Sequence, residues 1–319
     1  MKILTILIFS GDRISVGNLL NDIYKINQSN FNIRLVDWGD NKKILKEKKK
    51  NISNFKKKLK NLKIYYHKDN WEIRYFKFMK KFNSKYTILI GDDDRINIKN
   101  FPKILKYLNF DFSGITVSFS NYRNNKDLKI KKIEPTHSIK PFDIYNDISL
   151  IGFVSCQIIR TSLIGQNFSS SKKSLLRSDF IQNFIILKII KKFNNWKILN
   201  LKCIYRRMGD LDTFIKPEHY ISRLKSEYSG YLIPLTKNFS HLKSNKIKKI
   251  YKTIFFKNIL SWLFLSIVNN GKKKTFKNIS QLRKIIDEPF IVKLTLFAFY
   301  IFPIFLLNFL RIIRRVFIK

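Results

Sequence analysis

Three consecutive aspartates, Asp92, Asp93 and Asp94, are the residues of this chain best suited to chemistry. They follow a glycine and residues 86–90 (YTILI), an apolar run typical of a buried strand. Adjacent carboxylates repel one another unless a cation lies among them, and a hard divalent cation that carries phosphates is a common partner. The pattern therefore indicates a metal and nucleotide site. A solvated turn is the alternative, because Gly-Asp is ordinary turn chemistry.

Strand-like and helix-like segments alternate through the N-terminal half. Strands are predicted at residues 1–9 (MKILTILIF), 32–36 (NIRLV), 62–66 and 86–90, and helices at 14–26 and 71–82. This alternation predicts a parallel sheet, in which ligands bind beyond the carboxyl ends of the strands. Polar turns follow the first two strands, so the residues expected to converge at that edge are Asp12, Arg13, Asp37 and Asp92 to Asp94.

Four segments together resemble the family-2 glycosyltransferases of the GT-A fold. They are residues 8–13 (IFSGDR), 35–41 (LVDWGDN), 72–76 (EIRYF) and 88–94 (ILIGDDD). Their order and spacing follow the family pattern, which closes one strand with Asp-x-Asp, and the resemblance extends from residue 1 to about 225. It implies a Rossmann-like, mostly parallel sheet flanked by helices. It also implies an inverting hexosyl transfer from a nucleotide-sugar donor, with Mg²⁺ or Mn²⁺.

The resemblance assigns roles to individual residues. Asp37 would contact the nucleobase, Arg74 the ribose and phosphates, and Asp92 and Asp93 the donor ribose. Asp92 and Asp94 would hold the metal. Residues 202–214 (KCIYRRMGDLDTF) resemble the segment that closes over the donor diphosphate. The donor site would be completed by Ser10, Asp12, Arg13, Arg206 and Arg207.

The chain departs from the family pattern in two turns. Ser10 and Gly11 replace the aromatic residue usual in the first turn, so a ring that would stack on the base is missing there. Trp38 stands where a second acidic residue is common, and it supplies either a stacking surface or core. Met208 replaces a histidine of many relatives, which leaves Asp210, Asp212 or His219 as substitutes for a metal ligand from that loop.

The acceptor side is expected in the second half of the catalytic region. Residues 152–159 (GFVSCQII) read as a strand. With the turn that follows, this segment resembles the family's acceptor-side strand, and the resemblance would place Gly152 and Ser155 near the sugar. Ser178 and Asp179 then precede an apolar helix at 180–190, where the family has a Glu-Asp pair that supplies the general base. Asp179 is therefore the predicted catalytic base. Helix N-capping is the alternative, since both residue types are favoured at that position.

The composition excludes several classes of protein. The formal net charge is +41, but lysine dominates, and no zinc-finger spacing, basic zipper or ribonucleoprotein motif occurs, so specific nucleic-acid binding is not expected. The lysines accompany abundant Asn, Ile and Phe, which suggests codon bias. The two cysteines, Cys156 and Cys203, lie in apolar segments and are expected to be reduced core residues.

The C-terminal region has a different character. Residues 294–310 (LTLFAFYIFPIFLLNFL) form an uncharged run near the lower length limit for a bilayer span, followed by Arg311, Arg314 and Arg315. Apolar helices flanked by cations suit an anionic membrane surface, and a buried helical hairpin is the alternative. Residues 1–9 are too short for a signal peptide and read as a strand, so a cytoplasmic protein at the inner face of the cell membrane is expected.

These features predict a GT-A catalytic domain at residues 1–225 and a helical, membrane-proximal region at 226–319. The predicted activity is transfer of a sugar to a glycan or lipid-linked saccharide, as in surface polysaccharide biosynthesis. Two alternatives stay open. One is a non-catalytic, basic peripheral membrane protein that keeps the fold. The other is a metal-dependent nucleotidyltransferase, although the chain has no glycine-rich phosphate loop near its N-terminus.

Overall fold

The computed structural model describes most of the 319 residues. The described ranges are 2–11, 13–26, 28–39, 42–69, 71–79, 81–123, 126–127, 153–166, 181–193, 195–207, 219–239, 245–284 and 288–301. The chain divides into two compact units. The first comprises residues 1–177 and 185–209, and the second comprises 178–184 and 210–319.

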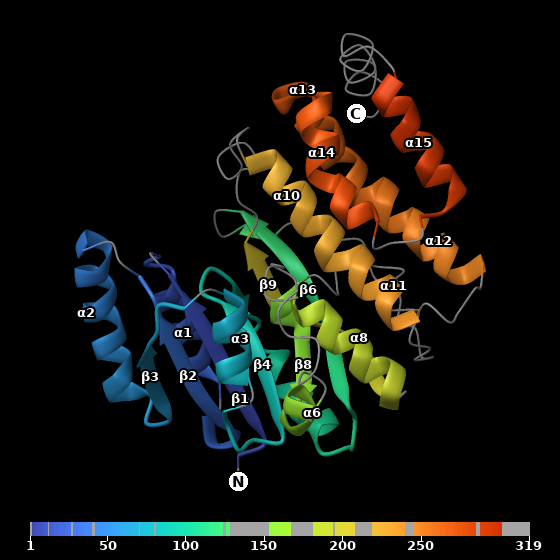
Figure 1. Ribbon diagram of the computed structural model, residues 1–319. Helices are drawn as coiled ribbons and strands as arrows, with labels where there is room; N and C mark the ends of the chain where they lie inside the picture. Colours follow the sequence, from blue (N-terminus) through green and yellow to red (C-terminus); the bar gives the residue numbers. More distant parts are fainter. Residues whose placement is uncertain are drawn as a thin grey trace. The chain divides into compact units, whose positions relative to one another are not determined.

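Strands and helices alternate from the N-terminus of the first unit, as the sequence predicts (Figure 1). The elements are β1 (Leu4–Ser10), α1 (Val16–Lys25), β2 (Phe31–Asp37), α2 (Lys42–Lys58), β3 (Leu62–Tyr66), α3 (Trp71–Met79) and β4 (Tyr86–Gly91). The predicted strand at 62–66 is confirmed to the residue. The second predicted helix ends at Met79 instead of Phe82.

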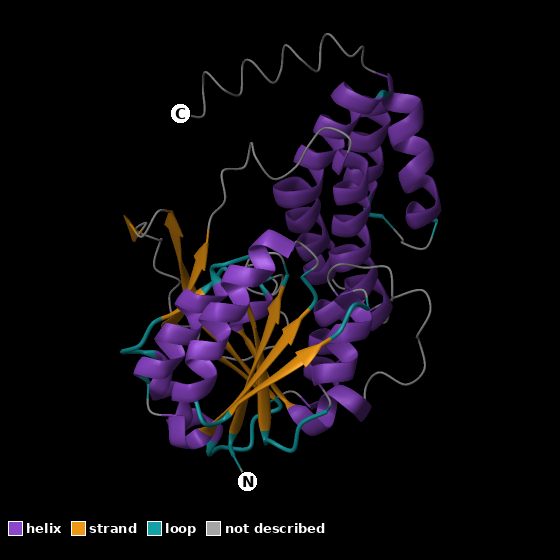
Figure 2. Ribbon diagram, turned by 90° about the vertical axis from the view of Figure 1, so that its left-hand side faces the viewer, coloured by secondary structure: helices purple, strands orange, loops and turns teal. Residues whose placement is uncertain are grey.

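One sheet holds all the strands of the first unit, in the order β3-β2-β1-β4-β8-β6-β9-β5, with β7 paired to β6. The first four strands are parallel, and Figure 2 shows the strands fanning across one twisted sheet. In this register Ser10 lies opposite Asp37, and Phe9 lies opposite Gly91. The carboxyl ends of β1, β2 and β4 therefore meet at the same edge.

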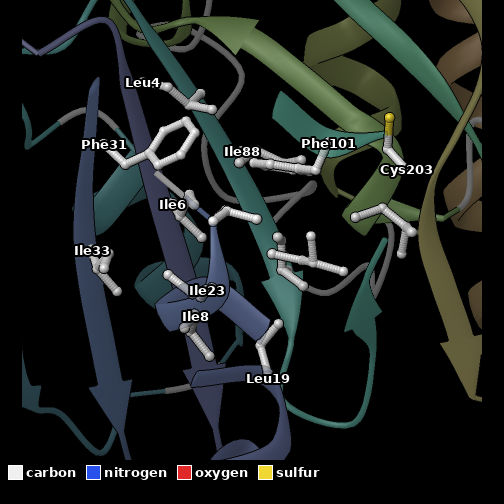
Figure 3. Close-up of a cluster of buried hydrophobic side chains, with 14 of the residues drawn as sticks. Leu4, Ile6, Ile8, Leu19, Ile23, Phe31, Ile33, Ile88, Phe101 and Cys203 are labelled. Carbon is white, nitrogen blue, oxygen red and sulfur yellow. The ribbon is translucent and has the colours of Figure 1, made fainter. Parts of the chain in front are cut away.

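The core forms because β1 is apolar on both faces, as buried parallel strands are. Ile6 and Ile8 pack with Leu19 and Ile23 of α1 in one continuous cluster (Figure 3). On the other face, the ring of Phe9 meets two aromatic rings edge to face, with centroid distances of 6.2 Å to Trp38 and 6.4 Å to Phe78 of α3. Helices thus cover both faces of β1 and fix the position of the turn that follows it.

The second half of the first unit combines antiparallel and parallel strand pairs. Its elements are β5 (Arg95–Ile96), α4 (Ile104–Leu108), β6 (Gly114–Arg123), β7 (Lys126–Asp127), β8 (Gln157–Arg160), α6 (Thr161–Gln166) and β9 (Trp196–Arg207). The helix α8 (Ile181–Phe193) begins in the second unit and continues into the first. The strand predicted at 152–159 begins only at Gln157. A 3₁₀ turn, Val154–Cys156, precedes it, and the Ser155 hydroxyl in this turn accepts from the Gly91 N–H and donates to Asp94.

Gly114 is required where β6 passes Trp196. A Cβ at this position would lie 2.3 Å from the indole, which is fully buried and donates from Nε1 to Thr116 Oγ1 at 2.9 Å. We expect Gly114→Ala to lower the free energy of unfolding by about 1–3 kcal/mol, the usual effect of overpacking. Urea unfolding measures this loss. Gly165→Ala is the matched control, because a Cβ there meets nothing within 4 Å, and an equal loss in both variants would contradict the prediction.

The second unit is helical in its described part. Its elements include α10 (Tyr220–Glu227), α11 (Ile233–Phe239), α12 (Asn245–Ile254), α13 (Leu260–Asn270), α14 (Lys272–Arg283) and α15 (Phe290–Ile301). One π-helical segment, Tyr228–Leu232, joins α10 to α11, and another, Phe255–Ile259, joins α12 to α13. Val292 and Leu296 of α15 are buried, so this helix belongs to the core of its unit.

Candidate functional site

The turn after β4 is tied to the turn after β1. Asp92 is buried and accepts three hydrogen bonds from the first turn: from the Ser10 hydroxyl at 3.1 Å, the Gly11 N–H at 3.1 Å and Arg13 Nη1 at 3.2 Å. Burial nevertheless raises the pKa of the Asp92 carboxyl, against the opposing effect of Arg13. Ser10, Arg13 and Asp92 therefore form one connected group at the edge of the sheet.

Arg13 also reaches the second aspartate. Its Nη1 lies 2.6 Å from Asp93 Oδ2, and both side chains are partly exposed, at 46% and 27%. The backbone of Asp93 is fixed from the opposite side, because Tyr122 donates its hydroxyl hydrogen to the Asp93 carbonyl at 2.6 Å. Arg13 thus supplies a positive charge that bridges two carboxylates and stays accessible from solvent.

Asp94 is the most deeply enclosed of the three aspartates. Its carboxylate accepts from the Ser155 hydroxyl at 2.5 Å and from the Arg207 backbone N–H at 3.3 Å. Burial raises the pKa of Asp94 to about 7, with Asp93 adding to the rise and the hydrogen bond from Ser155 opposing it. When Asp94 is ionised, the protein compensates its negative charge only in part.

Asp37, the last residue of β2, is buried with a lysine. Lys48 of α2 has no exposed surface, and its Nζ donates to Asp37 Oδ1 at 2.5 Å and to the Gly11 carbonyl at 2.6 Å. The Gly39 N–H also donates to Oδ1, at 3.1 Å. Lys48 was missed by sequence reasoning, although a signal exists. It interrupts an apolar stripe with helical spacing, formed by Leu45, Ile52, Phe55 and Leu59.

An open pocket of about 390 Å³ lies beside these carboxylates. Its lining comprises Phe9, Gly11, Arg13, Trp38, Leu89, Ile90, Gly91, Asp92, Asp93 and Val154. The indole of Trp38 approaches Gly11 so closely that a Cβ there would lie 3.2 Å from the ring. The glycine in the first turn therefore leaves room for an aromatic ring supplied by the second turn.

Arg74 of α3 is buried, with its guanidinium 3.6 Å from the centre of a Trp38 ring and 6.0 Å from that of Phe9. Such a cation–π contact holds the indole in place. At the end of β9, the Arg206 guanidinium lies 5.1 Å from the centre of the Phe153 ring, and its charge opposes the rise that burial causes in the pKa of Asp94. The ends of β1, β2, β4 and β9 thus contribute to one region of the first unit.

Several residues singled out from the sequence lie outside the described ranges. They are Asp12 of the first turn, Gly152, Ser178, Asp179, Met208, Asp210 and Asp212. His219 precedes α10 in the second unit and is exposed. Their roles stay predictions from the sequence.

The donor set fits a hard divalent cation. Within the described ranges, no three Asp, Glu, His or Cys side chains converge as a complete metal cage. Mg²⁺ does not need one, because substrate phosphates and water supply most of its ligands and the protein adds one or two carboxylates. Asp93 and Asp94 offer only oxygen, and the raised pKa of Asp94 indicates unmet negative charge. Both oxygens of Asp92 and both oxygens of Asp94 already accept hydrogen bonds, so a cation held there would share them with the protein's donors.

Comparison with known proteins gives a match in structure only. No family model and no curated protein matches the sequence. The solved structure of TarS from S. aureus aligns with a TM-score of 0.52 at 14% identity, covering 90% of this chain and 50% of that chain. This chain therefore spans half the length of the full TarS chain.

Two ligand complexes align equally well. TarS 1–349 in complex with UDP gives a TM-score of 0.53 at 14% identity, covering 89% of this chain and 88% of that chain. The mannosyltransferase PcManGT from Pyrobaculum calidifontis, in complex with GDP-Man and Mn²⁺, gives 0.53 at 9% identity, covering 93% and 81%. These likenesses confirm the predicted fold class, a GT-A type α/β sheet flanked by helices with a C-terminal helical extension.

Proposed function

We propose that this protein is a glycosyltransferase that moves a sugar from a nucleotide-sugar donor to a glycan or lipid-linked saccharide. The observation that carries the proposal is the connected group of Ser10, Arg13 and the three aspartates beside an open pocket. The fold supports it, since solved structures with this fold contain UDP-GlcNAc or GDP-Man and Mn²⁺. We assign catalysis to residues 1–225 and membrane proximity to residues 226–319.

In this proposal the donor lies across the edge of the sheet. Trp38 and Asp37 border the nucleobase, Arg74 lies near the ribose and phosphates, and Asp92 and Asp93 face the ribose. The proposed diphosphate site comprises Ser10, Asp12, Arg13, Arg206 and Arg207, of which the three arginines offset the charge of the diphosphate. Asp94 with Asp92 or Asp93 would hold Mg²⁺ or Mn²⁺, and a cation bound there would supply positive charge for the diphosphate.

The proposed chemistry is a single in-line displacement with inversion. The acceptor hydroxyl oxygen forms a bond to the anomeric carbon, and the bond from that carbon to the diphosphate oxygen breaks. Asp179 takes the hydroxyl proton as general base. Arg13 serves the leaving group in this scheme, since its guanidinium is accessible and already faces two carboxylates.

A nucleotide-sugar panel tests the proposal. Purified full-length protein is heated with each sugar nucleotide, with and without Mn²⁺, because a ligand that binds only the native state raises the melting temperature. We expect at least one nucleotide sugar to raise it and Mn²⁺ to increase the effect. A panel that leaves the melting temperature unchanged throughout would refute the assignment.

Trp38 is expected to stack on the nucleobase. Base–aromatic stacking contributes about 1–3 kcal/mol, so Trp38→Leu should weaken binding of the nucleoside diphosphate by roughly 10-fold or more. Isothermal titration measures this change. Tyr66→Leu is the matched control, because Tyr66 is 68% exposed and lies outside the pocket. Unchanged affinity in the Trp38 variant would assign the indole to packing alone.

We also propose that the second unit binds an anionic membrane surface at the inner face of the cell membrane. No helix within the described ranges is long and apolar enough to cross a bilayer. However, α15 exposes Phe290, Phe297 and Tyr300 at 79%, 61% and 58%. The preceding helix α14 begins with Lys272, Lys273 and Lys274, and these features suit a helix that lies in the interface.

Vesicle sedimentation tests this membrane contact. Full-length protein should pellet with phosphatidylglycerol vesicles at low salt and less at high salt, because each nearby cation contributes about 1 kcal/mol and is screened. Replacing Lys272, Lys273 and Lys274 by glutamine should weaken pelleting. The matched control replaces three exposed lysines of α2 by glutamine, Lys49, Lys50 and Lys57. A truncated variant that removes the C-terminal segment should end after Ile301, because Val292 and Leu296 of α15 are buried and must be kept. Protein that stays in the supernatant at low salt would contradict the contact.

A further inference from the structure

A second pocket lies within the second unit, between α14 and α15. Its volume is about 610 Å³, which is in the range of small-molecule sites. One wall comes from α14, and the other comes from residues of α15 between Phe290 and Tyr300. We call this pocket the α14–α15 groove. Leu296, which is 1% exposed, is buried at its base.

Contacts at both ends fix the groove, and they show that the two helices run antiparallel. At one end, the Lys272 ammonium donates to the Tyr300 carbonyl at 2.8 Å, and the rings of Phe276 and Tyr300 meet edge to face with centroids 5.3 Å apart. At the other end, Arg283 of α14 donates to Glu288 through Nε and Nη2 at 2.9–3.2 Å. The groove is therefore a defined feature of the helical unit.

The groove is apolar toward one end and cationic toward the other. Phe276 and Tyr300 line the apolar end, and Phe297 lies one turn before Tyr300. Arg283 and Lys293 line the other end. Lys293 and Tyr300 are two helical turns apart, a span of about 10 Å along the axis. An elongated ligand with an apolar chain and one anionic end matches this distribution.

The cationic end includes one arginine whose orientation is fixed. Glu288 is buried and binds two nitrogens of Arg283, whose side chain is nevertheless 31% exposed at the groove. An arginine presents five N–H donors in a planar fork, more than one carboxylate uses, and the fork matches the geometry of phosphate. A buried carboxylate that orients an arginine is a specific arrangement, which the general abundance of lysine does not explain.

The wall from α15 leaves apolar side chains uncovered. Phe290, Leu294 and Phe297 line the groove and are 79%, 48% and 61% exposed. Contiguous exposed apolar surface marks an interaction site in soluble proteins. Since cations stand at one end of this surface, its occupant is expected to be an amphiphile and not a uniformly apolar molecule.

We propose that the α14–α15 groove binds one molecule of a phosphate-bearing lipid. Its chain lies along Phe297 and Tyr300, and its phosphate lies at Arg283 and Lys293. A lipid-linked saccharide has this chemistry, so the inference rests on the proposed function and gives the lipid part of the acceptor a site in the second unit. The exposed rings of this groove are those assigned above to the membrane surface, from which such a lipid would enter.

The first measurement is isothermal titration of full-length protein with single-chain probes below their critical micelle concentrations. Octyl phosphate and decyl phosphate differ only in chain length, decyl glucoside has an uncharged head, and inorganic phosphate has no chain. Decyl phosphate should saturate one site and bind about 10-fold more tightly than octyl phosphate, because burial of each CH₂ group adds to the affinity. Affinity that is independent of chain length, or equal affinity for inorganic phosphate, would overturn the inference.

The cationic end is tested with Lys293→Gln. This variant should bind decyl phosphate about 5-fold more weakly, because it loses one cation near an anionic head group, and it should bind decyl glucoside as the wild type does. Lys277→Gln is the matched control, since Lys277 is exposed on α14 and lies outside the groove lining. Unchanged affinity for decyl phosphate in the Lys293 variant would overturn the assignment of the phosphate.

Arg283 is tested together with its partner. Arg283→Gln alone would leave the buried Glu288 carboxylate without its counter-charge, so it is combined with Glu288→Gln in a double variant. With the arginine gone, the preference for decyl phosphate over decyl glucoside should fall to within about 3-fold. A double variant that retains the full preference would remove Arg283 from the site.

The apolar end is tested with Phe297→Ala. Loss of this ring should weaken decyl phosphate and decyl glucoside alike, by about 10-fold, because both probes share the chain. Phe110→Ala is the matched control, since Phe110 is 60% exposed in the first unit. Sedimentation velocity without lipid tests a second copy of this chain as the occupant. A dimer that Phe297→Ala dissociates would overturn the lipid assignment.

The nucleotide-sugar melting shift separates this inference from the proposed function. Lys293→Gln and Phe297→Ala lie outside the first unit and should keep the shift of the wild type. Wild-type protein that shows the shift but binds no decyl phosphate would overturn the lipid groove alone. Protein that binds decyl phosphate at one site without any nucleotide-sugar shift would support the groove and refute the proposed transferase.

Discussion

Asp94→Asn is expected to abolish turnover and metal-dependent binding of nucleoside diphosphate while the protein stays folded. The carboxylate is buried just after β4, and burial raises its pKa to about 7. Asparagine keeps the shape and can still bond Ser155 and the Arg207 N–H, but it carries no charge for a divalent cation. Titration of UDP and GDP with and without Mn²⁺ measures the loss.

Asp94→Asn is also expected to stabilise the ligand-free protein at pH 8, although it abolishes metal-dependent binding. With its pKa raised from 3.8 to about 7, Asp94 holds a proton in the folded state that it releases in the unfolded state. The free energy of unfolding therefore falls as pH rises from about 4 to 7, and it is lower by about 4 kcal/mol above that window. Asp94→Asn removes this dependence, so the variant should melt higher than the wild type at pH 8 and gain less at pH 5.

Thermal melts at the two pH values, without divalent cations, check this effect. Asp111→Asn provides a matched control, because the Asp111 side chain is 78% exposed. If the Asp94 variant keeps Mn²⁺-dependent nucleotide binding, the triple aspartate has no part in metal binding. If it melts lower than the wild type at pH 8, burial does not dominate the ionisation of Asp94.

Much of the fold could be predicted because its determinants are local. The apolar run of β1 and the helical spacing of α1 appear directly in the sequence, and alternating strands and helices require parallel pairing. Parallel pairing then brings the ends of neighbouring strands together. The convergence of Arg13 with Asp92 and Asp93 follows from the register, in which Phe9 lies opposite Gly91.

The details of the site depend on contacts that no local pattern encodes. Lys48 stands among many lysines of α2, and only the tertiary structure selects it as the partner of Asp37. Ser155 is predicted to lie near the sugar, which stays a prediction. The structure adds that its hydroxyl donates to Asp94 and that it lies in a 3₁₀ turn, where the apolar sequence predicts a strand. From the sequence, Gly11 stands where relatives have a stacking aromatic residue. In the structure, the Trp38 ring lies against Gly11. In each case two distant segments determine the role jointly.

Asp179→Asn should lower kcat by roughly 10²-fold or more and leave donor affinity unchanged, because general-base catalysis typically contributes that much. Asp179 lies outside the described ranges, two residues before α8 begins at Ile181, so the prediction rests on the sequence and the proposed mechanism. Asparagine caps a helix as well as aspartate does. The substitution therefore removes the proton acceptor without removing a cap.

Single-turnover kinetics and donor titration separate the two roles, with Ser178→Ala as the companion variant. If Ser178 is the cap, its loss should cost about 1 kcal/mol of stability and little of the chemical rate. If Asp179 is the base, Asp179→Asn should slow the chemical step and leave the melting temperature unchanged. Donor affinity that falls as far as kcat would make Asp179 structural, and the base would then have to be sought on another element of the chain.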